Sequence, residues 1–133
     1  MFDKKKKTKI KTKVLVVEDD SLLLQVLIEG LKSEGFEVVG EENGLKAVSH
    51  IEKFMPDVIL LDLILPGLDG FAILKELKSN KETDKIPVIV VSNLSSISDV
   101  KAAKAVGAEE YFIKSNTQMD EIVKFIKSKH YGK

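Results

Sequence analysis

The sequence of 133 residues contains no cysteine, no tryptophan and no arginine. Without cysteine, the chain has no disulfide framework, no thiolate metal site and no cysteine nucleophile. Because all 21 basic residues are lysines, no guanidinium group is present to bind a phosphate through two parallel hydrogen bonds. The longest apolar stretches, such as residues 86–91, are far too short to cross a bilayer. These absences exclude disulfide-rich scaffolds, thiol chemistry and a membrane-spanning segment within this sequence.

The composition is that of one soluble globular domain. Apolar residues make up 44% of the chain and charged residues 32%, which is an ordinary balance for such proteins. A chain of this length buries roughly two-thirds of the surface that it exposes when unfolded. We therefore predict a single folded domain over residues 13–131.

The net charge of zero hides an uneven distribution. Residues 1–13 contain seven lysines and one aspartate, a net charge of +6, so the rest of the neutral chain carries −6. Lysines so close together repel one another, and nothing between them can be buried. We predict that residues 1–12 form a disordered basic arm, with contact to an anionic partner as the alternative. The arm lacks the apolar core of a signal peptide, so we expect a cytoplasmic protein.

Five short apolar segments alternate with five segments of helical periodicity. Strands are predicted at residues 14–17, 38–39 with their neighbours, 58–61, 88–91 and 111–113. Helices are predicted at about 21–34, 45–54, 71–77, 98–106 and 119–129. Asp20, Ser96 with Asp99, and Thr117 with Asp120 are expected to cap helices. This alternation predicts an α/β fold, in which helices cover both faces of a parallel sheet.

Chemically active side chains follow the predicted strands. Glu18 and Asp19 follow the first strand, Asp62 follows the third, Ser92 ends the fourth and Lys114 ends the fifth. In a parallel sheet the carboxyl ends of the strands form the ligand-binding edge. Crowded carboxylates are best tolerated around a cation, and oxygen ligands suit Mg²⁺. We predict that Asp62 is a nucleophile that forms an aspartyl phosphate, helped by the Ser92 hydroxyl and the Lys114 ammonium.

Four stretches of the chain together resemble the receiver domain of bacterial two-component response regulators. They are VLVVEDD at residues 14–20, PDVILLDLILPGLDG at 56–70, VIVVS at 88–92 and GAEEYFIK at 107–114. The resemblance implies a flavodoxin-like, doubly wound parallel sheet of five strands in the order 2-1-3-4-5, with five helices. It also implies a signalling switch that catalyses only its own phosphorylation and slow dephosphorylation.

The resemblance further implies a role for each residue of the site. Asp62 is the phosphoacceptor, and Mg²⁺ is held by Glu18, Asp19, Asp62 and the backbone carbonyl of Ile64. Lys114 and Ser92 contact the phosphoryl group, and Ser92 with Tyr111 forms the switch. For Tyr111 the alternative is a plain core aromatic residue.

The same resemblance implies the partners. A sensor histidine kinase or a histidine phosphotransfer protein supplies the phosphoryl group. A downstream protein binds the face made by helix 98–106, strand 111–113 and helix 119–129, and a homodimer forms on phosphorylation. We expect neither nucleic-acid binding by this domain nor membrane contact.

The sequence departs from the family's pattern beside the site. Ser115 follows Lys114 where the family usually has proline after a cis peptide bond, and Asn93 replaces a smaller residue after Ser92. The side chains of Ile64 and Leu94 are both apolar, and in this family their positions govern how water reaches the phosphoryl group. We therefore predict slow self-dephosphorylation.

Three other functions compete with the phosphorylated switch. A receiver-like interaction module that does not use phosphorylation is the main alternative. A phosphatase of the haloacid dehalogenase type needs a second aspartate where Ile64 stands. A flavin-binding protein needs a phosphate loop where Glu18, Asp19 and Asp20 would repel the cofactor. His50 and His130 have no carboxylate or histidine at ligand spacing, so we interpret both as surface residues.

Overall fold

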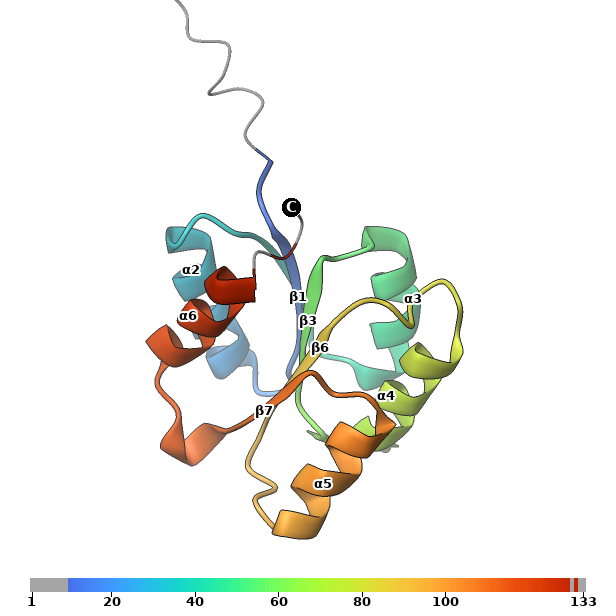
Figure 1. The fold of residues 1–133 in the computed structure, drawn as a ribbon. Coiled ribbons are helices and arrows are strands. Elements are labelled where there is room, and N and C mark those ends of the chain that lie inside the picture. The colour runs from blue at the N-terminus through green and yellow to red at the C-terminus, as the bar shows by residue number, and fades with distance from the viewer. Residues whose placement is uncertain (1–9, 130, 132–133) are drawn as a thin grey trace, which may run out of the picture.

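Five parallel strands form the centre of the structure, a computed structural model that describes residues 10–129 and 131 (Figure 1). The sheet has the order β2-β1-β3-β6-β7. It is built from β1 (Lys13–Val17), β2 (Glu37–Glu41), β3 (Val58–Leu61), β6 (Val88–Ser92) and β7 (Glu110–Ile113). When only these five strands are numbered along the chain, the order is 2-1-3-4-5, so the predicted flavodoxin-like arrangement is confirmed.

Helices cover the sheet on both sides, as Figure 1 shows. One layer holds α2 (Ser21–Ser33) and α6 (Met119–Lys129), and the other holds α3 (Gly44–Phe54), α4 (Gly70–Ser79) and α5 (Ile97–Val106). Each predicted helix and strand is present within a few residues of its expected bounds. Among the described helices, none combines the length and the apolar character needed to cross a membrane.

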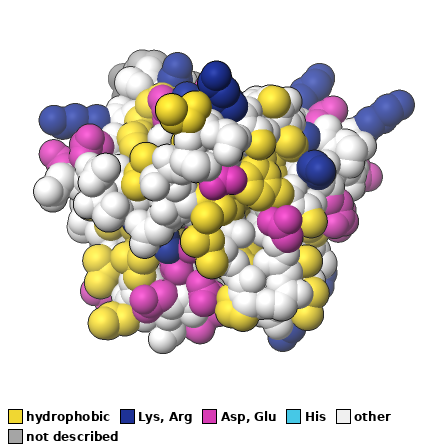
Figure 2. All heavy atoms as spheres, turned by 90° about the horizontal axis from the view of Figure 1, so that it is seen from below, with side chains coloured by type: hydrophobic (Ala, Val, Ile, Leu, Met, Phe, Trp, Pro, Cys, Tyr) yellow, Lys and Arg dark blue, Asp and Glu magenta, His cyan; other side chains and the backbone are white. Residues whose placement is uncertain are grey.

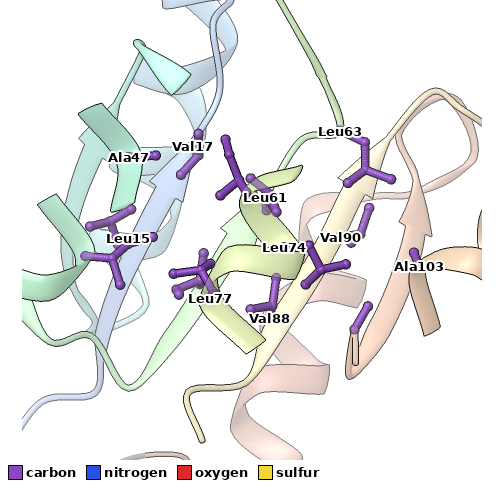
Figure 3. Packing of buried hydrophobic residues seen from close by; sticks show 14 of the residues in the cluster. Leu15, Val17, Ala47, Leu61, Leu63, Leu74, Leu77, Val88, Val90 and Ala103 are labelled. Atoms are coloured by element: carbon purple, nitrogen blue, oxygen red, sulfur yellow. The ribbon is translucent and has the colours of Figure 1, made fainter. Parts of the chain in front are cut away.

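Alternation along the strands divides the core into two layers. In β1, Val14 and Val16 pack toward α2 and α6, while Leu15 and Val17 pack toward α3 and α4. Successive side chains of a strand point to opposite faces, so each strand contributes to both layers. Figure 3 shows the layer beneath α3, α4 and α5. All residues of β3 and β6 are buried, as expected for strands covered on both faces.

Two of the predicted helix caps are present. The Asp20 carboxylate accepts hydrogen bonds from the first backbone N–H groups of α2. At the start of α5, the Ser96 hydroxyl accepts a hydrogen bond of 3.1 Å from the Asp99 N–H and contacts the Asp99 carboxylate at 2.7 Å. These local bonds satisfy donors that have no partner within the helix.

The third predicted cap, Thr117 with Asp120, is wrong. The Thr117 hydroxyl instead donates to the Ile113 carbonyl at 2.8 Å. The Gln118 N–H donates to the Glu121 carboxylate at 2.7 Å, one residue further along the chain. The cause is the 3₁₀ helix η1 (Lys114–Asn116), which was not predicted and which turns Thr117 back toward the sheet.

A short antiparallel hairpin follows β3 and was also not predicted. Its strands are β4 (Ile64–Leu65) and β5 (Leu68–Asp69), joined by the turn at Pro66 and Gly67. Gly67 has a φ of +68°, a conformation that residues other than glycine seldom adopt. The hairpin leads directly into α4, whose first turn is capped by the Asp69 carboxylate. Asp69 is thus both the last residue of the hairpin and the cap of the helix that begins at Gly70.

The two ends of the described chain meet at the edge of the sheet where the strands begin. The Thr12 hydroxyl donates a hydrogen bond of 2.8 Å to the Tyr131 carbonyl. The Tyr131 hydroxyl in turn donates to the Glu109 carboxylate at 3.3 Å. Most of the predicted basic arm, and also His130, lies outside the described residues.

Candidate functional site

Three carboxylates meet at the carboxyl ends of β1 and β3. Val17 and Leu61 are paired in neighbouring strands, so Glu18 and Asp62, the next residues, emerge side by side. Carboxylate oxygens of Glu18, Asp19 and Asp62 all lie within 4.8 Å of one another. Glu18 and Asp62 are only 2% and 4% exposed, whereas Asp19 is exposed. The structure thus brings together the acidic residues that the sequence singled out.

Lys114 joins this cluster from the other half of the sheet. It follows β7, and its Nζ lies 2.6 Å from Glu18 Oε1 and 2.6 Å from Asp62 Oδ2. Burial alone would lower the pKa of Lys114, but its hydrogen bonds to Asp62 and Glu18 outweigh burial and raise the pKa. The ammonium therefore stays charged at neutral pH and holds the two buried carboxylates together.

The Asp62 carboxylate is held on both sides. Its Oδ1 accepts a hydrogen bond of 3.0 Å from the Ile64 N–H, and its Oδ2 accepts one from Lys114. A carboxylate with a donor on each oxygen has little freedom to rotate. Asp62 is thus fixed with its carboxylate toward the other acidic groups, which suits a nucleophile that must be positioned.

Burial disfavours the charged form of Glu18. Burial raises the pKa of Glu18, and this effect exceeds the lowering that comes from the Lys114 ammonium and the Asp20 N–H. The Asp20 N–H donates to Glu18 Oε2 at 3.0 Å. An additional positive charge beside Glu18 would therefore be favourable.

The donor set fits a divalent cation. The cluster holds three carboxyl groups and only one ammonium group, so acidic side chains outnumber the basic one. All the candidate ligands are oxygens, as a hard cation such as Mg²⁺ prefers. Ile64 lines the same hollow, and its backbone carbonyl remains a predicted ligand. Glu18, Asp19 and Asp62 are thus the residues that would hold the metal.

Ser92 and Tyr111 lie on the other side of Asp62, on β6 and β7. Ser92 is fully buried, and its Oγ accepts a hydrogen bond of 3.3 Å from the Leu94 N–H. The Tyr111 hydroxyl donates to the Leu94 carbonyl at 2.6 Å. Burial is the main reason why the pKa of Tyr111 is raised. The two residues that the resemblance assigns to a switch are therefore connected to the same loop residue.

The carboxylate cluster and Lys114 line an open hollow at the carboxyl end of the sheet. Asp20, Asn93 and the hairpin residues 64–66 complete its lining. Figure 2 looks at this end of the molecule, where acidic and hydrophobic side chains lie next to one another. A small anionic group can reach Asp62 from solvent through this hollow.

The structure also shows contacts that sequence reasoning missed. Gly70 packs so closely on the backbone of Leu63 and Asp62 that a Cβ added to it would lie 2.4 Å from the Leu63 Cα. His50, predicted as an unpartnered surface residue, has its Nδ1 3.0 Å from Glu41 Oε1. Both contacts join segments that are separated in the chain. Spacing along the sequence therefore gave no signal for them.

Comparisons with known proteins agree with this geometry. The family model of the response regulator receiver domain matches residues 14–127. Protein PilH of Pseudomonas aeruginosa PAO1 is 34% identical over 102 residues, which cover 77% of this chain and 84% of PilH. The probable transcriptional regulator ycf27 of Porphyridium aerugineum is 34% identical over 78% of this chain but only 42% of its own length. The chain thus spans about two-fifths of that longer regulator.

Solved structures of receiver domains have the same fold. The BeF3-activated N-terminal receiver domain of Klebsiella pneumoniae RstA superposes with a TM-score of 0.81 at 26% identity. The match covers 88% of this chain and 97% of the chain in that receiver-domain structure. The Mn²⁺-bound response regulator Rcp1 has a TM-score of 0.75 at 30% identity, covering 88% and 92%. With the family model matched over most of its length, this chain belongs to the response regulator receiver domains, the phosphoacceptor switches of two-component signalling.

Proposed function

We propose that Asp62 accepts a phosphoryl group from a histidine kinase or a histidine phosphotransfer protein in a reaction that depends on Mg²⁺. The observation that carries this proposal is the position of Asp62, buried in one cluster with Glu18 and Asp19 and 2.6 Å from the Lys114 ammonium. A nucleophilic carboxylate, a divalent-cation site and a fixed positive charge are what phosphoryl transfer requires.

The transfer itself is a single exchange of bonds. An oxygen of the Asp62 carboxylate attacks the phosphorus of the donor's phosphohistidine, so a P–O bond forms and the P–N bond breaks. The imidazole leaves with the bonding electron pair and takes up a proton from water. Bound Mg²⁺ supplies positive charge to the phosphoryl oxygens. Lys114 neutralises a further part of that charge, and the Ser92 hydroxyl donates a hydrogen bond to it.

The output of the switch is a change in a binding surface. Ser92 moves toward the phosphoryl group, and Tyr111 follows into the space behind it. Their shared partner, Leu94, lies just before α5, so the surface formed by α5, β7 and α6 changes shape. A downstream protein binds this surface, and two phosphorylated copies form a dimer through it. Function lies in this population shift rather than in turnover of a substrate.

For this role, we expect a cytoplasmic protein in which residues 13–131 form the receiver domain and a basic arm precedes it.

The competing proposal is a module that binds its partner without phosphorylation. Acetyl phosphate or beryllofluoride with Mg²⁺ distinguishes the two, using intact mass and amide NMR as readouts. We expect acetyl phosphate to add one phosphoryl group and both reagents to shift resonances around Ser92 and Tyr111, whereas no adduct and no shifts would favour the unphosphorylated module.

Binding of Mg²⁺ is expected to depend on pH through Glu18. Burial raises the pKa of Glu18, so protons compete with the metal at a higher pH than they would at an exposed glutamate. At a Mg²⁺ concentration of 100 times its Kd, the free energy of unfolding should rise by about 2.7 kcal/mol. This gain should be present at about pH 7.5 and should shrink toward about pH 5 as Glu18 takes up its proton.

Urea unfolding followed by circular dichroism, with and without Mg²⁺, measures this gain at each pH. Asp19→Asn removes a carboxylate from the cluster and should abolish most of the gain. Asp20→Asn makes the same change next to the cluster, keeps a helix-capping side chain and should retain the gain. A Mg²⁺ effect that is equal at both pH values would contradict the role of Glu18.

The phosphoryl group is expected to stay on Asp62 well beyond seconds. Hydrolysis requires water to attack the phosphorus in line with the P–O bond to Asp62, which breaks to release inorganic phosphate. Ile64 is half exposed and lines the hollow, whereas Leu94 packs against the core. The Ile64 side chain therefore provides the apolar cover. Decay of the phosphorylated protein, followed by intact mass, should speed up in Ile64→Asn; decay of the wild type within seconds would refute the prediction.

A further inference from the structure

The side chain of Asn93 connects two loops at the rim of the hollow. Its Oδ1 accepts a hydrogen bond of 3.1 Å from the backbone N–H of Ser115, 22 residues away in the chain. Ser115 directly follows Lys114 in η1. We propose that Asn93 is a positioning residue that holds Lys114 relative to the loop after Ser92, and that it slows both the entry and the loss of the phosphoryl group.

The hydrogen bond uses a donor that has no partner inside η1. Ser115 lies in the first turn of this short helix, where backbone N–H groups have no carbonyl to bond. The residue before the helix, Ile113, provides no side-chain cap. A proline at position 115 would have no N–H to offer. The pairing therefore depends on two residue identities of this chain, an acceptor side chain at position 93 and a residue other than proline at position 115.

Asn93 lies in the middle of a segment that is bonded on both sides. Before it, the Ser92 hydroxyl accepts from the Leu94 N–H, and after it, the Leu94 carbonyl accepts from Tyr111. Asn93 adds the contact to Ser115. Residues 92–94 are thus tied both to the middle of β7 and to the backbone just beyond its end. Movement of the Ser92 loop is coupled to movement of the backbone that carries Lys114.

Asn93 and Lys114 also form the boundary between two hollows. One is the acidic hollow around Asp62, and both residues line it. The other is a mainly apolar groove between α2 and the start of α6, which the same two residues line together with Ser115. If the bond between Asn93 and Ser115 were broken, the side chains of Asn93 and Lys114 could move apart and the acidic hollow would become more accessible from the apolar groove. This consequence rests on the proposed function, because it concerns donors and water that approach Asp62.

Three substitutions separate the hydrogen bond from the bulk of the side chain. Asn93→Leu keeps a similar volume but has no acceptor, Asn93→Ala removes both, and Asn93→Asp retains an acceptor. Amide hydrogen exchange at Ser115, measured by NMR in the metal-free protein, reports the bond directly. Because Asn93 and Ser115 are exposed and water competes, we expect exchange to be about twofold to fivefold faster in the Leu and Ala variants. The Asp variant should exchange as the wild type does, and unchanged exchange in Asn93→Leu would overturn the proposal.

The second readout is the rate at which acetyl phosphate phosphorylates Asp62 and the rate at which the product decays. Both rates should rise by about twofold to fivefold in Asn93→Leu and in Asn93→Ala. In a Ser115→Pro background, Asn93→Leu should have no further effect, because the donor is already absent. An effect of Asn93→Ala without one of Asn93→Leu would assign the role to bulk and overturn the proposal. A wild type that takes up no phosphoryl group would instead refute the proposed function, even with the Ser115 exchange as expected.

Discussion

Replacing Asp62 by asparagine is expected to abolish all detectable phosphoryl incorporation from acetyl phosphate while leaving the fold intact. The amide oxygen is too weak a nucleophile to attack phosphorus, and no second carboxylate holds the same place. Asp62 accepts a hydrogen bond from the Ile64 N–H on one oxygen and from Lys114 on the other. Asparagine has only one acceptor oxygen and therefore loses one of these bonds. Lys114 keeps its contact with Glu18 at 2.6 Å. Intact mass measures the loss, and circular dichroism checks the fold.

Asp20→Asn is the matched control for this substitution. Asp20 also lines the hollow, and its side chain caps α2, a role that asparagine performs equally well. We expect this variant to be phosphorylated at close to the wild-type rate. If Asp62→Asn gained a phosphoryl group in the same yield as the wild type, Asp62 would not be the acceptor.

Gly70→Ala is expected to cost about 3 kcal/mol of the free energy of unfolding, the upper end of the usual range for overpacking. A Cβ at residue 70 would lie 2.4 Å from the Leu63 Cα and 2.7 Å from the Asp62 carbonyl oxygen. Both are backbone atoms, so no side-chain rotation can relieve the contact. The strand end that carries Asp62 must move instead. Urea unfolding measures the cost, and phosphorylation should also slow because the carboxylate is displaced.

Gly44→Ala provides a matched control for the loss at Gly70. Both glycines are buried first residues of helices, and each follows a residue whose side chain caps the helix. At Gly44, however, the nearest atoms are the side-chain ends of Leu65 and Leu68, at 3.1 and 3.2 Å. These ends can move by a few tenths of an ångström, so we expect a change below about 1 kcal/mol. Equal losses in the two variants would show that helix position matters rather than contact with the Asp62 backbone.

Local patterns in the sequence were sufficient to predict most of the fold. The apolar runs of β3 and β6 identified strands buried on both faces, and the helical spacing between strands identified every α-helix. Asp20 and Ser96 were recognisable as caps because a capping side chain bonds to residues only two or three positions away. The grouping of Glu18 with Asp62 also followed, since residues after neighbouring parallel strands emerge at one edge.

Features that depend on contacts between distant segments could not be predicted in this way. The hairpin of β4 and β5 has only two residues in each strand, too few to show a periodicity. The tight contact of Gly70 with Leu63 depends on how α4 enters the fold, not on a motif in the sequence. The bond from Ser115 to Asn93 spans 22 residues and joins the 3₁₀ helix η1 to the loop after β6. The prediction of Thr117 as a cap failed because nothing in the sequence indicated the 3₁₀ turn before it.

The hydrogen bond between Thr12 and Tyr131 makes the chain a good candidate for circular permutation. These residues lie 2.8 Å apart across that bond, so a short glycine-rich linker can connect them without crossing the molecule. They lie where the strands begin, whereas Asp62 lies where the strands end. New termini could therefore be opened at the exposed residues Lys81 and Glu82, in the loop between α4 and β6, while the hollow around Asp62 remains unobstructed.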